Sequence, residues 1–587
     1  MRHFRTSLGL LASIVAFTAA PCAVHAQQLT DQVAPEAATV ATQKPAVRAA
    51  RQMVVAANPL AAQAGRAMLD AGGSAADALV AVQTVLGLVE PQSSGLGGGA
   101  FLVWYDAVTG QTETYDGRET APKAATGDLF IGADGKPLEF FQAVVGGRSV
   151  GAPGVTRLME MAHSRHGRLD WPQLFQPAIS LARDGFAVSP RLAALVEQDR
   201  QRLAAEPTTR DYFFPGGVAL KAGDLLRNDA YAETLDLIAD GGADAFYLGP
   251  VANALVEAVR GHATNPGMLT ADDLRDYQAV ERAAACAPYR GLSVCGMGPP
   301  SSGAIAIGQI LGMVEPFDIA MLGPDDPETW RIIGDATRLA FADRERYVAD
   351  SDFVSMPKGL LDRDYLQRRA QLLRRPMALG KDEATAGEPP WDKVELRRDA
   401  PALEAPSTSH FVIVDAEGNI ASMTSSIENG FGARLMTGGF LLNNQLTDFA
   451  FAATKDGVAV ANRVEPKKRP RSSMSPTIIL RDGKPVYALG SPGGSSIIPY
   501  VATTIIALVD WKMDIQQAIS MPHLTNRFGT YELEAGTLAV EMANELESLG
   551  FKTAVKEQNS GLHGIAIGPD GIFGGADPRR EGMASGD

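Results

Sequence analysis

The sequence predicts an α+β protein in which layered sheets lie between helices. Three observations predict it: Ala-rich helices follow a short strand within residues 54–91, a helical stretch runs from about residue 170 to 277, and strands dominate after residue 408. Helices and sheets in this mixture bury one face each and leave the helices on the outside.

The N-terminal part opens with VVAANPLAAQAGRAMLDAGGSAADALVAVQTVLGLVEP, which predicts a strand and two helices separated by AGGS. GLGGGAFLVWYD is a glycine loop entering a strand, and TETYDGRETAP adds a second strand and a turn. The glycine loop does not fit a nucleotide site, because no Lys-Ser/Thr follows it and the spacing is wrong. We expect close backbone packing there instead. ETWRIIGDATRLAFADRERYV carries apolar residues at helical spacing and predicts another helix.

The C-terminal part is punctuated by turns. HFVIVD-AEGN-IASMTSS and TIIL-RDGK-PVYALG predict two hairpins, the second with Asp-Gly at its turn. SPGGS opens a helix over IIPYVATTIIALVDW, and a helix over AVEMANELESLG with a final hairpin around GPDG closes the chain. Two segments lack periodicity, 27–51 and 377–407, and are expected to be mobile.

Composition narrows the function classes. The 587 residues carry a net charge of -15 and a pI near 5.1, with 45% hydrophobic and 21% charged residues. Nucleic acids and anionic membranes select basic surfaces, so neither is expected as a partner. The composition is typical of a soluble enzyme that acts on small molecules.

The first 26 residues predict a secretory signal peptide. Arg2 and Arg5 precede the apolar run LGLLASIVAFTAA, and VHA before Gln27 supplies the small residues of a cleavage site. No other stretch approaches the roughly 18 apolar residues of a membrane span. The mature protein is therefore expected to be periplasmic or secreted.

Two cysteines remain after the signal, Cys286 and Cys295 in CAPYRGLSVC. The intervening YRG could turn the chain so that the two meet, and export favours a disulfide between them. Two buried thiols are the alternative. A zinc site lacks a second cysteine pair, and no metal or cofactor is expected.

Thr408 is the candidate for chemistry. It stands between the loop-like EAPS and the strand HFVIVD. A threonine hydroxyl becomes a nucleophile when a base sits beside it, and the residue's own α-amine serves if the residue is an N-terminus. An α-amine titrates near ~7.7–8.0, so it accepts protons at neutral pH. This chemistry requires a cut between Ser407 and Thr408. An ordinary strand start is the alternative.

The surrounding motifs favour the cut. STSHFVIVDAEGNIASMTSS, GFLLNNQLTDF, RPRSSMSPTIILRDGK and LGSPGGS follow one another over about ninety residues, after SSGLGGGAF, DGRETAP, GAPG, LARDGF, PPSSG and RLAFADRERYV. Together these resemble the γ-glutamyltranspeptidases (glutathione hydrolases) over nearly all of the mature chain.

The resemblance implies an N-terminal-nucleophile hydrolase, a four-layer αββα sandwich that forms one compact unit. It implies a zymogen that cleaves itself into a large subunit, 27–407, and a small subunit, 408–587, which stay together as a heterodimer. Thr408 would form an acyl-enzyme with glutathione or another γ-glutamyl compound. Water, an amino acid or a peptide would then accept the acyl group.

Matching positions imply further roles. Arg118 would clamp the substrate α-carboxylate in two-pronged fashion, since a guanidinium pairs with carboxylate that way. Ser426 would hydrogen-bond the nucleophile, and Gly493 and Gly494 would form the oxyanion site at a helix start. The remaining substrate contacts would be hydroxyl donors to the carboxylate and acceptors for the α-ammonium, respectively Ser472 and Ser473, and Glu428, Gln445 and Asp448.

One segment departs from the family pattern. Between Asp448 and Ser472 no aromatic residue follows Phe451, where many bacterial members carry a longer lid with a tyrosine. A shorter lid predicts a more open pocket that admits bulkier donors or acceptors. A glutaryl-type cephalosporin acylase of the same fold is therefore the nearest rival. A periplasmic binding protein and a non-processing structural relative are more distant ones.

Overall fold

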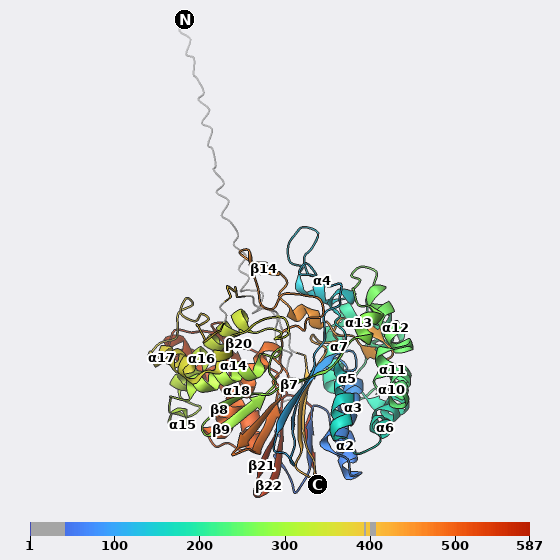
Figure 1. Ribbon diagram of the computed structural model, residues 1–587, viewed down its shortest axis with the longest axis horizontal. Coiled ribbons are helices and arrows are strands. Elements are labelled where there is room, and N and C mark those ends of the chain that lie inside the picture. The colour runs from blue at the N-terminus through green and yellow to red at the C-terminus, as the bar shows by residue number, and fades with distance from the viewer. Residues whose placement is uncertain (2–41, 393–394, 400–406) are drawn as a thin grey trace.

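The computed structural model describes Met1 and residues 42–392, 395–399 and 407–587. Two seven-stranded sheets lie face to face at its centre, with helices on both outer sides (Figure 1). These four layers confirm the predicted αββα sandwich. The predicted signal peptide and most of the predicted leader lie outside the described residues.

The first sheet is antiparallel, and the final predicted hairpin and the Asp-Gly hairpin form its centre. Its strand order is β1 (Val47–Ala49), β22 (Gly571–Ala576), β21 (His563–Gly568), β17 (Lys484–Gly490), β16 (Thr477–Arg481), β9 (Leu292–Gly296) and β8 (Ala285–Tyr289).

The second sheet is also antiparallel and has at its centre the hairpin that follows Thr408. Its strand order is β23 (Met583–Gly586), β2 (Met53–Ala56), β10 (Ser409–Val414), β11 (Ile420–Ser426), β3 (Gly99–Tyr105), β4 (Thr112–Gly117) and β7 (Val280–Ala283). The C-terminal strand β23 was not anticipated from the sequence.

Alternation along β10 shows how the layers pack. Phe411 and Ile413 belong to the apolar core under the N-terminal helices, whereas Val412 and Val414 belong to the core between the two sheets. Successive side chains of a strand point to opposite faces, so a strand covered on both sides reads as a continuous apolar run. HFVIV is such a run, and it places His410 on the same face as Val412.

Helices cover the second sheet on one side of the molecule (Figure 1). They are α2 (Pro59–Asp70), α3 (Ala75–Val89), α5 (Val155–His166), α6 (Trp171–Asp184), α7 (Pro190–Gln198), α8 (Arg200–Leu203), α9 (Pro207–Phe213), α10 (Asp229–Gly241), α11 (Asp244–Tyr247), α12 (Pro250–Arg260) and α13 (Ala271–Arg275). The short helix α4 (Phe140–Val144) instead contributes Ala143 to a separate apolar cluster with Leu446 and Phe449.

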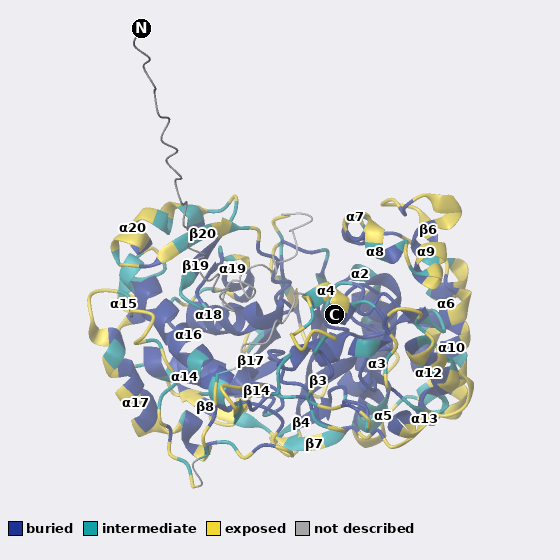
Figure 2. Ribbon diagram, turned by 90° about the horizontal axis from the view of Figure 1, so that it is seen from above, coloured by how far each residue is buried: buried dark blue, intermediate teal, exposed yellow. Residues whose placement is uncertain are grey.

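Helices on the other side cover the first sheet. They are α14 (Gly303–Val314), α15 (Ile319–Leu322), α16 (Pro327–Tyr347), α17 (Arg363–Gln371), α18 (Ile497–Val509), α19 (Ile515–Ser520) and α20 (Ala543–Ser548). Figure 2 shows buried residues on the sheets and on α14, α16 and α18, and exposed ones along outlying helices such as α15 and α20. Every residue of α3 and of α18 is buried, which explains why those helices are apolar all round.

The remaining strands are short and lie outside the two sheets: β5 (Phe186–Ala187), β6 (Leu225–Leu226), β12 (Met436–Thr437), β13 (Phe440–Leu441), β14 (Thr454–Lys455), β15 (Val458–Ala459), β18 (Leu524–Thr525), β19 (Thr530–Glu534) and β20 (Lys552–Lys556). Single 3-10 turns join the larger elements: η1 (Gly147–Ser149), η2 (Pro215–Gly217), η3 (Lys358–Leu361), η4 (Leu372–Arg374), η5 (Gln445–Asp448), η6 (Gly494–Ser496) and η7 (Leu538–Met542).

Three expectations need correction. The predicted mobile leader reaches too far, because β1 lies within it and pairs with β22. The predicted helix over AVEMANELESLG is divided into η7 and α20. The described part of 377–407 lacks regular structure as expected, yet it is anchored, since Ala378 N–H donates to Leu549 O and Leu379 N–H to Asp335 Oδ2.

The cysteines face each other across the β8–β9 hairpin, where Cys286 pairs with Cys295 in the strand register. A disulfide joins them, which selects one of the two alternatives left open by the sequence. Within the described residues, no helix combines the length and the apolarity needed to cross a membrane.

Candidate active site

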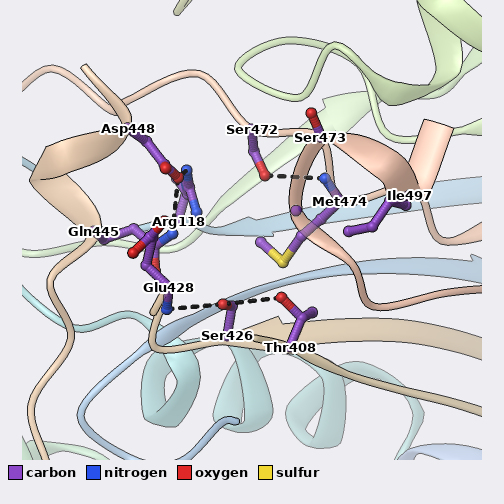
Figure 3. A pocket seen from close by; sticks show the side chains of 11 residues that line it. Arg118, Thr408, Ser426, Glu428, Gln445, Asp448, Ser472, Ser473, Met474 and Ile497 are labelled. Atoms are coloured by element: carbon purple, nitrogen blue, oxygen red, sulfur yellow. Dashed lines mark hydrogen bonds and ion pairs between the residues drawn. The ribbon is translucent and has the colours of Figure 1, made fainter. Parts of the chain in front are cut away.

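Thr408 lies at the end of the inter-sheet space, directly before β10, and is 3% exposed. It lines a pocket formed by eleven residues. Figure 3 labels all of them except Gly494. Eight predicted site residues besides Thr408 line this pocket: Arg118, Ser426, Glu428, Gln445, Asp448, Ser472, Ser473 and Gly494. The sequence did not single out Met474 and Ile497, which complete the lining.

The nucleophile candidate is held by two oxygen atoms. Thr408 Oγ1 donates to the carbonyl oxygen of Ser407 at 2.6 Å and lies 3.2 Å from Ser426 Oγ. Ser426 Oγ also donates to Ser407 O at 2.9 Å and accepts from Glu428 N–H at 2.9 Å. The hydroxyl of Thr408 therefore rests against the peptide group that precedes it in the chain.

Arg118 follows β4 and is fully buried at the other end of the pocket. Its Nε donates to Pro470 O, and its Nη2 donates to Arg471 O and to Asp448 Oδ2. These bonds leave Nη1, which lies 3.8 Å from the Glu119 carboxyl oxygen Oε2. A carboxylate held by both Nη1 and Nη2 would take the place of Asp448 on Nη2, and the two-pronged clamp stays a prediction.

Ser472 and Ser473 supply the missing donors. Ser472 Oγ accepts from Met474 N–H at 3.1 Å, and Ser473 Oγ accepts from Arg344 Nη2 at 2.8 Å. Because each hydroxyl oxygen is already engaged as an acceptor, its proton is available for a group in the pocket. A carboxylate beside Arg118 would meet these two protons and Nη1.

Acceptors gather on the side of Glu428. Glu428 accepts from Asn444 Nδ2, and Gln445 Nε2 donates to Asp448 Oδ2 at 2.9 Å. Gln445 Oε1 is buried and has no hydrogen-bond partner among the described residues. A buried acceptor without a donor is costly unless a ligand supplies one. The pocket thus presents one cation and two carboxylates, a pattern that suits a ligand with one carboxylate and one ammonium.

The two glycines before α18 behave differently. Gly494 lines the pocket, whereas Gly493 lies behind it, with φ 134° and an ideal Cβ position 2.9 Å from the Tyr500 ring. Only glycine adopts that φ without strain. Gly494 begins η6, which leads into α18, so the positive N-terminal end of these helices adjoins the pocket that Thr408 lines. The role of the two glycines as an oxyanion site stays a prediction.

The glycine loop before β3 packs as the sequence predicts. A Cβ on Gly97 would lie 2.1 Å from Leu441 O, and one on Gly98 would lie 2.2 Å from Ser426 O. A side chain at Gly98 would push away β11, which carries Ser426, and one at Gly97 would push away β13. The loop therefore belongs to the scaffold of the site.

The segment between Asp448 and Ser472 contributes no aromatic residue to the pocket lining. Phe451 stacks on Phe130 at a centroid distance of 4.6 Å, and the β14–β15 hairpin follows. The short lid and the more open pocket stay predictions.

Three residues that the sequence did not single out adjoin the site. Glu119 is fully buried, both its carboxylate oxygens lack hydrogen-bond partners among the described residues, and burial raises its pKa to about 8. Arg580 Nη1 donates to Thr408 O at 3.1 Å, and Asn559 Oδ1 accepts from Arg580 Nε. Glu119 directly follows Arg118 in DGRETAP, and Arg580 stands in DPRREG, where nothing in the sequence sets it apart from Arg579.

A hydroxyl residue at the start of a central strand in an αββα sandwich defines an N-terminal-nucleophile hydrolase, and the fold and site together place this chain in that class. The family model "Gamma-glutamyltranspeptidase" matches residues 61–587. The chain belongs to the γ-glutamyltranspeptidase family, and it is a γ-glutamyl transferase and hydrolase.

Individual relatives agree with this assignment. The glutathione hydrolase proenzyme of Bacillus subtilis (strain 168) is 36% identical over 547 residues, with 91% of each chain covered. That of Escherichia coli (strain K12) is 35% identical over 548 residues, again with 91% of each covered. The crystal structure of cephalosporin acylase from Bacillus halodurans superposes with a TM-score of 0.80 at 26% identity, covering 93% of this chain and 97% of the other.

Proposed function

We propose that this chain is exported to the periplasm or secreted, cuts itself between Ser407 and Thr408, and then transfers γ-glutamyl groups from glutathione and related amides. The residues 27–407 and 408–587 remain associated as large and small subunits. The observation that carries the proposal is the position of Thr408 Oγ1, 2.6 Å from Ser407 O and in one pocket with Arg118.

Processing starts from the uncut geometry. Thr408 Oγ1 attacks the Ser407 carbonyl carbon, the C–N bond breaks, and the acyl group passes from nitrogen to oxygen as an ester. The nitrogen takes the hydroxyl proton in this step and becomes the free α-amine of Thr408. Water then cleaves that ester, which frees the Ser407 carboxylate and the Thr408 hydroxyl. Ser426, which hydrogen-bonds the same carbonyl oxygen, supports the developing charge.

Turnover reuses the same hydroxyl. The α-amine takes the hydroxyl proton while Oγ1 attacks the γ-carbonyl carbon of the donor. The tetrahedral oxygen is stabilised by the N–H groups of the Gly493–Gly494 turn. When the C–N bond breaks, the leaving amine takes the proton back from the ammonium, and a γ-glutamyl ester remains on Thr408. Water, an amino acid or a peptide then resolves that ester.

Donor recognition follows from the charges of the pocket. The α-carboxylate binds Arg118 Nη1 and the hydroxyls of Ser472 and Ser473. The α-ammonium binds Gln445 Oε1 and the carboxylates of Glu428 and Asp448. Arg118 to Asp448 is a buried ion pair, so a zwitterionic donor can exchange partners with it without leaving an unpaired charge.

The test asks whether cleavage of the precursor and release of p-nitroaniline both depend on the Thr408 hydroxyl. Thr408→Ala should remain a single chain and release no p-nitroaniline from γ-glutamyl-p-nitroanilide, whereas Thr408→Ser should be cut and active. The wild-type small subunit should begin with threonine on N-terminal sequencing. Cleavage of the alanine variant at the same bond would overturn the assignment of the nucleophile.

A glutaryl amide acylase is the second candidate, because of the structural likeness to the cephalosporin acylase. A glutaryl group lacks the α-ammonium, and acceptors for that ammonium line this pocket as Glu428, Gln445 and Asp448. We therefore expect kcat/KM to be higher for γ-glutamyl-p-nitroanilide than for glutaryl-p-nitroanilide. The opposite order would favour the acylase.

A further inference from the structure

Arg580 is a buried cation that touches the backbone of the nucleophile. The guanidinium is 2% exposed, and its Nη1 donates to the carbonyl oxygen of Thr408 at 3.1 Å. Nitrogen and carbonyl oxygen of one residue are three bonds apart, so this contact keeps the guanidinium within about 7 Å of Thr408 N. A charge at that range acts on any titration of that nitrogen.

Arg580 is itself fixed in place. Asn559 Oδ1 accepts from its Nε at 2.9 Å, and a Cβ on Gly561 would lie 2.6 Å from its Cδ. Lys44 Nζ donates to the carbonyl oxygens of Asp577, Arg580 and Gly582, which holds the loop before β23. The arginine cannot swing away without breaking this packing.

Several charged or titratable groups lie on the elements that form the pocket and on the strands beside Thr408. They are Arg118 after β4, Glu428 after β11, Asp448 in η5 and Arg580 before β23, with His410 and His563 on the facing strands β10 and β21. Burial keeps both histidines neutral by holding their pKa below 6.5. The two carboxylates belong to the donor ammonium once a donor is bound, which leaves Arg580 as the charge in direct contact with Thr408.

We propose that Arg580 is a positioning residue of the nucleophile, which orients the Thr408 backbone and, by its positive charge, keeps the freed α-amine in the neutral form that accepts the hydroxyl proton. This inference rests on the proposed role of Thr408. A like charge within about 7 Å, at an effective dielectric of about 20, disfavours protonation and lowers the pKa of the amine by about one unit or more. The amine would then act as a base below its ordinary range of about 7.7–8.0.

Four substitutions separate the effect of the Arg580 charge on the Thr408 amine from its effect on the position of the Thr408 backbone. Arg580→Lys and Asn559→Ala keep the cation, whereas Arg580→Gln removes it and Asn559→Asp neutralises it while keeping the arginine. Each variant is purified as the cut heterodimer, its active sites are counted from the burst of p-nitroaniline, and kcat/KM per active site is measured from pH 5 to 9.

The charge variants, Arg580→Gln and Asn559→Asp, should shift the acid limb, where kcat/KM falls at low pH, to higher pH by about one unit. The charge-keeping variants, Arg580→Lys and Asn559→Ala, should lower the maximal kcat/KM and leave the pH of the acid limb unchanged. If Arg580→Gln does not accumulate, Asn559→Asp carries the same expectation with the arginine present. An acid limb that coincides with the wild type in every charge variant that can be measured overturns the proposal.

A parallel measurement tests the basis of the inference. Wild-type enzyme quenched with acid during turnover should carry the γ-glutamyl group on the peptide that begins at Thr408, as seen by mass spectrometry. Absence of that adduct would contradict the proposed nucleophile itself. Its presence together with unmoved limbs would contradict only the role of Arg580.

Discussion

Arg344 and Ser473 are joined by a hydrogen bond of 2.8 Å from Nη2 to Oγ, although 129 positions separate them in the chain. Arg344 belongs to α16 and is 1% exposed, so the bond is shielded from water. Its Nε donates to Ser302 Oγ, whose own hydroxyl donates to Ser472 O. One buried arginine therefore braces both serines of the predicted carboxylate site.

Removal of the Ser473 hydroxyl should weaken donor binding. Hydrogen bonds to charged groups contribute about 1.5–3 kcal/mol, so Ser473→Ala should raise KM for γ-glutamyl-p-nitroanilide by roughly tenfold or more, with a much smaller change in kcat. Ser475→Ala is the matched control, because Ser475 Oγ donates to Ser473 O and does not line the pocket. Equal effects from both variants would remove Ser473 from the carboxylate site.

A side chain at Gly493 should damage the chemical step. Gly493→Ala meets the Tyr500 ring and requires φ near 134°, so the turn must shift its N–H groups. Loss of one oxyanion donor lowers kcat by about 10²–10³-fold. We expect a decrease of that size in the kcat of Gly493→Ala with γ-glutamyl-p-nitroanilide. Gly483→Ala is the control for a glycine at positive φ, since its Cβ would meet nothing within 4 Å. A normal kcat in Gly493→Ala would exclude the turn from the oxyanion site.

Glu119 should make donor binding sensitive to alkaline pH. Its pKa is about 8, so the carboxyl is protonated at neutral pH and ionises above that value, 3.8 Å from Arg118 Nη1. The new charge would compete with the donor carboxylate for Arg118, and KM should rise from pH 8 to 9.5. Glu119→Gln mimics the protonated form and should give a flatter profile. Identical KM profiles in the two proteins would contradict this role.

Three buried histidines should make the fold sensitive to acid. Burial lowers the pKa of His410, His523 and His563, the last to about 3. Between the unfolded pKa near 6.5 and these folded values the unfolded chain binds more protons, so the free energy of unfolding falls as pH drops. Each such group contributes up to about 1.4 kcal/mol per pH unit.

Thermal unfolding from pH 7.5 to 4 is the measurement for this acid sensitivity. The melting temperature should decline below about pH 6.5, and His563→Gln, which cannot be protonated, should reduce the steepness of that decline. His163→Gln is a control on a half-buried histidine. A steepness that is unchanged in His563→Gln would show that His563 is not among the groups responsible.

Local sequence was sufficient for most of the fold. Strands and hairpins such as β10–β11 and β16–β17 were predictable because alternation, apolar runs and an Asp-Gly turn act within a few residues. The start of α18 was predictable from SPGGS for the same reason. Strands β1 and β23 were missed, because neither is apolar enough to be recognised and each forms by pairing with a distant strand.

The candidate site was predictable in its members but not in their contacts. Arg118 was expected to hold a carboxylate, but the sequence did not show that its Nη2 bonds to Asp448 and to Arg471 O. Glu119 and Arg580 carry no recognisable pattern in the sequence. Their importance follows from desolvation and from proximity to Arg118 and Thr408, which only the packed chain creates.

The sequence by itself determined which residues could do the chemistry, the class of the fold, and the place where a new N-terminus would arise. Only the tertiary structure decided which atoms meet, as in the bond between Arg118 and Asp448 across 330 positions and that between Arg580 and Thr408 across 172. The physical reason is range: turn and strand preferences act between near neighbours, whereas the geometry and charge of a buried site are set when sheets and helices pack and water is excluded.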